Sequence, residues 1–195
     1  MRPLNIILGV FSVLIAAFLI GSLYSPLIPY VILSVICFSG ASYILNDILD
    51  VRIDRVNCPE RPLPSGQLGI FYSLFLMGTL YLTGIVACTY LHTLGQQIAL
   101  FLVLPLLILY SPLLKNLPLL GNIVVGGILG LVFIFTEGSL QGNVDKMWIP
   151  FALAMSLSVI RELCKDGADI HGDSIANLQT FPRRYGTIAT LWLLR

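Results

Sequence analysis

The sequence predicts an all-α fold, a polytopic bundle of transmembrane helices. Hydrophobic residues make up 57% of the 195-residue chain, whereas Asp, Glu, Lys and Arg together make up only 11%. Soluble domains contain about 45–50% apolar and about 25% charged residues. The third observation is that apolar runs recur along the chain at lengths close to the roughly 20 residues that a membrane-spanning helix needs. We therefore expect an integral membrane protein.

Six apolar runs are the expected spans, and a seventh begins near Gly186 and stops at Arg195. The fifth and sixth are short for spans unless flanking residues are included. In the fifth run, Gly126, Gly127 and Gly130 provide a small-residue face for close helix packing. We treat residues 1–195 as one domain, and the interrupted seventh run suggests a truncated chain. The six runs are Leu4–Tyr24, Leu27–Ile48, Ile70–Leu91, Gln97–Leu113, Asn122–Phe135 and Met147–Leu163.

The basic residues predict how the bundle is oriented. Nine of the eleven Lys and Arg residues fall on connections of one side, which are the N-terminus, residues 49–69, the turn around Lys115 and residues 161–186. Lys146 alone falls on the other side, and Arg195 has no assigned side. The positive-inside rule makes the side with these nine basic residues cytoplasmic, in a multi-pass protein of the cell membrane. The net charge of +1 argues against a nucleic-acid partner, which would require a basic face.

Two triplets of aspartates share one spacing, with offsets of 0, 3 and 7 residues. On a continuous helix this spacing keeps three side chains within an arc of about 60°. Both triplets follow apolar runs, at helix ends where the dipole disfavours carboxylates, so a cation has to compensate them. Carboxylate oxygens are ligands that Mg²⁺ prefers. We expect two Mg²⁺ sites that hold a diphosphate at the membrane surface, with ligands Asp47, Asp50 and Asp54 in one site and Asp166, Asp169 and Asp173 in the other.

Four residues beside the triplets are candidates for binding the diphosphate. Arg61 and Lys115 are the strongest, because neither has an acidic partner at helical spacing as obvious as that of Lys165. Guanidinium and ammonium groups bind phosphate oxygens well once metal ions neutralise the carboxylates. Asn46 provides a carbonyl ligand or orients an aspartate. For each basic residue, a role in membrane orientation or in an ion pair is the alternative.

Three segments carry a resemblance to a known family. Asn46–Gly66 contains the first triplet and a Pro-rich stretch, Tyr110–Asn122 contains Lys115, and Arg161–Gly186 contains the second triplet. Together, in this order, they resemble the signatures of the UbiA superfamily of membrane prenyltransferases. Members usually form nine-helix bundles, so the resemblance covers about two-thirds of the fold. The chain departs from the pattern at Ala168, where ether-lipid members often have an acid.

The resemblance implies Mg²⁺-dependent transfer of a prenyl group from an allylic diphosphate to a lipophilic acceptor in the membrane. It implies that Asp50 and Asp169 are essential for catalysis, and it implies no obligate protein partner. Met1–Asn5 and Ile53–Asn57 are most similar to the ether-lipid branch of the family, in which geranylgeranylglyceryl phosphate accepts a geranylgeranyl group. An aromatic acceptor of the quinone, chlorophyll or haem pathways is the alternative.

Three other functional classes are weighed against this one. A CDP-alcohol phosphotransferase would continue Asp166-Gly167 with Ala-Arg, whereas Ala168-Asp169 follows here. A transporter should place charges within its spans rather than at one membrane face. A catalytically inactive fragment of the family is the third alternative, because spans that close the bundle are missing.

Overall fold

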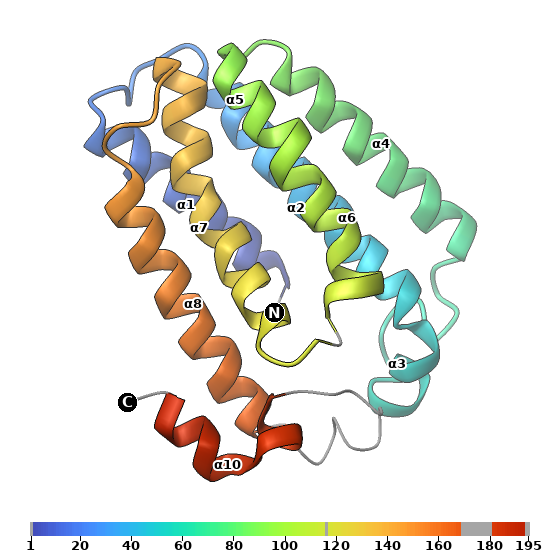
Figure 1. Cartoon of the computed structure of the whole chain (residues 1–195). Coiled ribbons are helices and arrows are strands. Elements are labelled where there is room, and N and C mark those ends of the chain that lie inside the picture. The colour runs from blue at the N-terminus through green and yellow to red at the C-terminus, as the bar shows by residue number, and fades with distance from the viewer. Residues whose placement is uncertain (1, 116, 169–180, 194–195) are drawn as a thin grey trace.

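The computed structural model describes residues 2–115, 117–168 and 181–193, and within these ranges the chain forms helices and no strands. Figure 1 shows long helices that lie side by side and cross the bundle in alternating directions. The predicted all-α fold is confirmed. The helices are α1 Arg2–Leu19, α2 Ile28–Leu49, α3 Val51–Asn57, α4 Ile70–Cys88, α5 Thr93–Gln97, η1 Ile98–Val103, α6 Leu104–Leu109, η2 Tyr110–Leu114, α7 Leu120–Gln141, α8 Trp148–Ala168 and α10 Phe181–Leu193.

Four helical segments of the described chain are long and apolar enough to cross a membrane. They are Ile28–Leu49, Ile70–Cys88, Thr93–Leu114 and Leu120–Gln141, and Leu4–Leu19 is a shorter apolar helix. Helix α8 has 21 residues, but its last two turns carry charged residues such as Arg161 and Asp166. The length and composition of the helices thus support a helical membrane fold, without reaching the six spans expected from the apolar runs.

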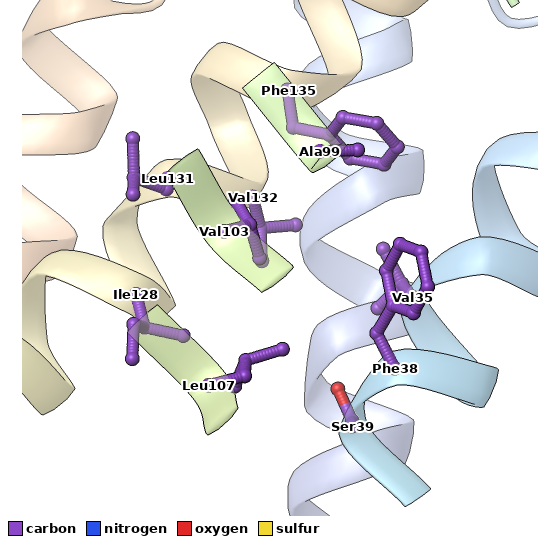
Figure 2. A pocket seen from close by; sticks show the side chains of 10 residues that line it. All are labelled: Val35, Phe38, Ser39, Ala99, Val103, Leu107, Ile128, Leu131, Val132 and Phe135. Atoms are coloured by element: carbon purple, nitrogen blue, oxygen red, sulfur yellow. The ribbon is translucent and has the colours of Figure 1, made fainter. Parts of the chain in front are cut away.

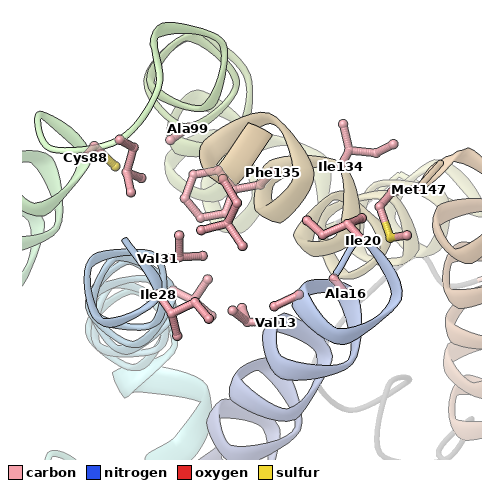
Figure 3. Close-up of a cluster of buried hydrophobic side chains, with 14 of the residues drawn as sticks. Val13, Ala16, Ile20, Ile28, Val31, Cys88, Ala99, Ile134, Phe135 and Met147 are labelled. Atoms are coloured by element: carbon pink, nitrogen blue, oxygen red, sulfur yellow. The ribbon is translucent and has the colours of Figure 1, made fainter. Parts of the chain in front are cut away.

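The core of the bundle lies between α1, α2 and α7. Figure 3 shows Val13 and Ala16 of α1, Val31 of α2 and Phe135 of α7 pointing toward one another. The outer faces are apolar as well, since Phe71 of α4 is 77% exposed. Helices that are apolar all round suit a lipid environment, where burial against lipid tails replaces burial against protein.

Glycines bring α7 and α8 into close contact. A Cβ atom added to Gly126 would lie 2.8 Å from the carbonyl oxygen of Met155, and one added to Gly130 would lie 2.8 Å from that of Phe151. A Cβ on Gly127 would meet nothing within 4 Å. Two of the three glycines expected to form a small-residue face therefore form it, and they allow the two backbones to touch.

The segment Thr93–Leu114 is a long helix with two wide, π-helical turns, η1 and η2. A proline lies beside or inside each wide turn, Pro105 just after η1 and Pro112 within η2. Proline has no N–H group and its ring clashes with the carbonyl group four residues earlier. A wide turn relieves both problems, because the carbonyl group accepts a hydrogen bond from one residue further along. The wide spacing is seen at η2, where the N–H of Lys115 donates to the carbonyl oxygen of Tyr110, five residues earlier and 2.8 Å away.

The polar connections gather at one end of the bundle. In Figure 1, α3, the turn before α7, the end of α8 and α10 all lie at the bottom of the view. The other turns, including the one that follows the left-handed Gly142 at the end of α7, lie at the opposite end. The expected seventh run begins within α10, which is kinked at Gly186, where φ is 87°. The end with the polar connections is the one that contains the predicted site.

Candidate active site

The first aspartate triplet lies across a break between α2 and α3. Helix α2 ends at Leu49, and Asp50 has φ −86° and ψ 0° before α3 begins at Val51. Backbone hydrogen bonds continue through the break, since Asp50 N–H donates to the carbonyl oxygen of Asn46 and Asp54 N–H donates to that of Asp50. The triplet thus extends over two consecutive helices separated by Asp50, whereas its spacing predicted one continuous helix.

Asp54 is buried and binds Arg61. Arg61 Nη1 donates a hydrogen bond to Asp54 Oδ2, 2.6 Å away, and the two side chains form an ion pair. Burial lowers the pKa of Arg61, but the hydrogen bond to Asp54 and the nearby charges, including Asp47, together outweigh it and raise the pKa above its ordinary value. The turn after Cys58 folds Arg61 back over α3, and the Arg61 N–H donates to the Cys58 carbonyl oxygen. The structure thus contains the ion pair that was the stated alternative for this arginine, and its role in diphosphate binding stays a prediction.

Asp50 is held by two side chains. Lys115 Nζ forms an ion pair with Asp50 Oδ2, and Asn46 Nδ2 donates to the same oxygen over 3.0 Å. Asn46 is held in turn by Ser111, whose Oγ donates to Asn46 Oδ1 over 3.1 Å. Ser111 was missed from the sequence. The available signal was its spacing, because Ser111 precedes Lys115 by four residues just as Asn46 precedes Asp50 by four.

The second triplet is represented by Asp166, because Asp169 and Asp173 lie outside the described residues. Asn122 Nδ2, on the first turn of α7, donates to Asp166 Oδ2 over 2.9 Å. Asn122 was not among the site residues predicted from the sequence. The sequence contains no local signal for this bond, since 44 residues separate the two side chains.

Lys165 was predicted to bind the diphosphate. In the structure its Nζ pairs with Glu162 Oε2 at 3.0 Å, and its side chain is 63% exposed. Arg161 pairs with the other oxygen of Glu162 at 2.9 Å. Both basic side chains are therefore engaged along α8 itself, which for Lys165 is the ion-pair alternative stated above.

The donor atoms at this end of the bundle fit Mg²⁺ chemically. In the part of the chain that the structure describes, no three His, Cys, Asp or Glu side chains converge to form a metal cage. Mg²⁺ does not require such a cage, because it usually binds one or two carboxylates and completes its shell with water and substrate phosphates. Asp50, Asp54 and Asp166 supply hard oxygen atoms of the type that it prefers.

An apolar cavity of about 50 Å³ lies between α2, the η1–α6 segment and α7. Figure 2 shows Phe38 and Phe135 at one side, with Ser39 as the residue whose side-chain oxygen reaches the lining. Ser39 precedes Asp47 by eight residues, which is about 12 Å along a helix. The bundle thus combines a polar end, rich in acids and cations, with apolar space inside. The lining residues are Val35, Phe38, Ser39, Ala99, Val103, Leu107, Ile128, Leu131, Val132 and Phe135.

Comparison with known families gives a match that covers nearly the whole chain. Residues 6–194 match the model of the UbiA prenyltransferase family. The chain belongs to the UbiA prenyltransferase family. A curated relative from Methanosarcina mazei, digeranylgeranylglyceryl phosphate synthase, is 38% identical over 157 residues, or 80% of this chain. The chain spans only 54% of that relative's length.

Solved structures of UbiA proteins share the fold. One of digeranylgeranylglyceryl phosphate synthase in membranes superposes with a TM-score of 0.79 at 27% identity, over 97% of this chain and 66% of that one. A UbiA homologue from Archaeoglobus fulgidus bound to DMAPP and Mg²⁺ superposes with a TM-score of 0.74 at 19% identity, over 85% and 60% of the two chains. The helical bundle described above is therefore a UbiA-type membrane fold.

Proposed function

We propose that this protein catalyses Mg²⁺-dependent transfer of a prenyl group from an allylic diphosphate to a lipophilic acceptor. One observation carries the proposal: Asp50 and Asp54, with their cationic partners Lys115 and Arg61, lie at the same end of an apolar bundle as Asp166. A prenyl diphosphate has a head group with several negative charges and a long apolar tail. A bundle with this polarity accommodates both parts at once.

The two triplets would each hold one Mg²⁺ ion, with Asp50 and Asp169 as the essential member of each. When bound, Mg²⁺ supplies Lewis-acid stabilisation of the negative charge that develops on the departing diphosphate. The structure of the A. fulgidus homologue bound to DMAPP and Mg²⁺ supports this pairing of metal and substrate. The proposed ligands are Asp47, Asp50 and Asp54 for one ion and Asp166, Asp169 and Asp173 for the other.

The neighbouring polar side chains would bind and orient the diphosphate. Lys115 and Arg61 each contact a carboxylate of the first triplet, so they lie where phosphate oxygens would meet them, and charge-assisted hydrogen bonds of this kind are strong. Asn46 keeps Asp50 oriented through its amide hydrogen atom. Lys165 would approach the head group from the end of α8.

In the reaction, the bond between the allylic carbon and the diphosphate oxygen breaks, and its electron pair leaves with the diphosphate. The acceptor oxygen then bonds to the allylic cation, and its proton passes to the departed diphosphate anion. Preorganised cations at the head group, Lys115 and Arg61, lower the barrier electrostatically. The apolar lining around Phe38 and Phe135 would keep water away from the cation.

The proposed acceptor is geranylgeranylglyceryl phosphate, with geranylgeranyl diphosphate as the donor. The names of the curated relatives, digeranylgeranylglyceryl phosphate synthases, support this choice. An acceptor that carries a phosphate needs additional cations at the same membrane face. Arg55 of α3 lies at the polar end and would take this role, and Arg161 of α8 would do so by exchanging its ion pair with Glu162 for the acceptor phosphate.

We further propose that residues 1–195 form one domain with six spans and the start of a seventh, and that the polar end faces the cytoplasm. Helices α1 and α8 would be the two spans beyond the four that length and composition alone identify. The charges at the end of α8 would then lie in the cytoplasmic interface rather than in the hydrocarbon.

The test is an acceptor panel with the full-length protein. Membranes that contain it are incubated with labelled geranylgeranyl diphosphate and Mg²⁺, together with geranylgeranylglyceryl phosphate, 4-hydroxybenzoate or dihydroxynaphthoate. We expect ether product only with the glyceryl phosphate, and none after Asp50→Asn or Asp169→Asn. Asp145→Asn is the matched control, because Asp145 lies exposed in the turn at the other end of α7. Efficient prenylation of an aromatic acid would refute the acceptor, and full activity of Asp50→Asn would refute the metal assignment.

A further inference from the structure

Asn122 occupies the end of the α7 face that contacts α8. Asn122, Gly126 and Gly130 follow one another at intervals of four residues, so they share one face of α7. Gly130 meets the Phe151 carbonyl group, Gly126 meets that of Met155, and Asn122 is the next position along this row.

The opposite face, on α8, has a matching row. Phe151, Met155 and Val159 are its glycine contacts, and Val159 Cγ2 would lie 2.7 Å from a Cβ on Gly126. Continuing by seven residues, or about two helical turns, leads from Val159 to Asp166. The hydrogen bond from Asn122 to Asp166 thus lies at the polar end of the α7–α8 contact, and the close approach at Gly126 and Gly130 determines how the two helices are aligned there.

The chain before Asn122 is also fixed at both ends. Ser111 contacts Asn46 of α2, and Lys115 contacts Asp50 in the break that follows α2. The chain then turns into α7 through Leu119, whose φ of 63° is unusual for a residue other than glycine. Immediately afterwards, a Cβ on Gly121 would lie 3.0 Å from the Leu114 carbonyl oxygen. One segment, residues 110–122, therefore contacts an acid of each triplet.

We propose that Asn122 is a positioning residue for the second Mg²⁺ site: it orients the Asp166 carboxylate and ties that site to the Lys115 end of the first. The inference rests on the proposed function, since it concerns the metal that the proposal assigns to Asp166. Groups that hydrogen-bond to a metal ligand fix its orientation, and their loss typically weakens metal binding 10–100-fold. Asn122 is suited to this task because its amide group donates to Asp166 Oδ2 from a tightly packed helix turn.

The experiment measures Mn²⁺ binding, by electron paramagnetic resonance, to the full-length protein in detergent with a non-hydrolysable prenyl diphosphate analogue. Asn122→Leu keeps the side-chain size and removes the donor. We expect it to weaken one of two Mn²⁺ sites about tenfold or more and to leave the other unchanged. Asn143→Leu is the matched control: it removes the same kind of Asn-to-Asp hydrogen bond, at 2.6 Å, at the opposite end of the α7–α8 pair.

A double mutant separates positioning from general damage. In an Asp166→Asn background, Asn122→Leu should have no further effect on Mn²⁺ affinity, because the carboxylate that it orients is gone. If Asn122→Leu does not fold, Asn122→Ser serves instead, since its short hydroxyl group cannot span the distance of the amide. Wild-type affinity at both sites in either folded variant would overturn the inference. Wild-type protein that binds no Mn²⁺ would instead overturn the proposed function.

Discussion

The neighbouring glycines Gly126 and Gly127 allow a sharp test of how α7 and α8 pack. A Cβ on Gly126 would lie 2.7 Å from Val159 Cγ2 and 2.8 Å from the Met155 carbonyl oxygen, whereas one on Gly127 would meet nothing within 4 Å. The carbonyl group belongs to a helix backbone and cannot move aside independently. Gly126→Ala must therefore push the two helices apart, and Gly127→Ala need not.

The expected magnitudes follow from two effects. Replacing glycine by alanine in a helix stabilises the helix by about 0.5–1 kcal/mol, and both variants share this gain. Overpacking a closely packed interface costs about 1–3 kcal/mol, and only Gly126→Ala carries this cost. The two variants should therefore differ in free energy of unfolding by about 1–3 kcal/mol, with Gly127→Ala equal to or above the wild type.

The free energy of unfolding can be measured by titrating the protein with SDS in mixed micelles and following its helix content. Gly130→Ala is a second test, because its Cβ would lie 2.8 Å from the Phe151 carbonyl oxygen. If Gly126→Ala and Gly127→Ala unfold at the same SDS fraction, the two backbones are not in contact. That result would also remove the register argument for Asn122.

Three further predictions concern the two ends of the bundle. Glu137 is fully buried and accepts hydrogen bonds from two backbone N–H groups at the start of α8, so Glu137→Ala should cost about 3–5 kcal/mol of unfolding free energy. Thr136→Val, at an equally buried neighbour that bonds only within its own helix, should cost less than about 1.5 kcal/mol, and equal losses would contradict the capping role. Lys115→Met should raise the KM for the prenyl diphosphate about tenfold or more, measured by steady-state kinetics, and an unchanged KM would exclude a phosphate contact. Cysteines introduced at Ser65 and Asn143 should react with a membrane-impermeant reagent from opposite sides of the membrane, and labelling of both from outside would refute the orientation.

Much of the fold could be predicted from the sequence because it depends on composition. In a bilayer, a long apolar run has few alternatives to a helix, since every backbone polar group must be satisfied within the segment. The expected apolar runs correspond to α1, α2, α4, Thr93–Leu114, α7 and α8, with shifts of up to six residues at their ends. The break at Asp50 was not predictable, because nothing local to that residue prohibits a continuous helix.

The candidate site was predictable only as far as helical spacing reaches. The patterns around Asp50 and Asp166 locate the acids, whereas the ion pair between Lys115 and Asp50 was only the alternative to the predicted diphosphate contact of Lys115. Asn122 and Ser111 were missed because their partners lie on other helices, 44 and 65 residues away. Such contacts depend on helix register, which the glycine contacts and the wide turns determine and which a periodicity argument does not include.

The wide turn before Pro105 also determines the direction in which the following half of its helix, up to Lys115, points. A turn that contains one additional residue shifts the rotational phase of everything after it by about 100° relative to a regular α-helix. If Pro105 were replaced by leucine and the helix became regular, Ser111 and Lys115 would rotate away from Asn46 and Asp50. Pro105 lies about 15 Å from Lys115, in the apolar part of the bundle. It thereby determines the side of the helix on which the lysine lies at the polar end.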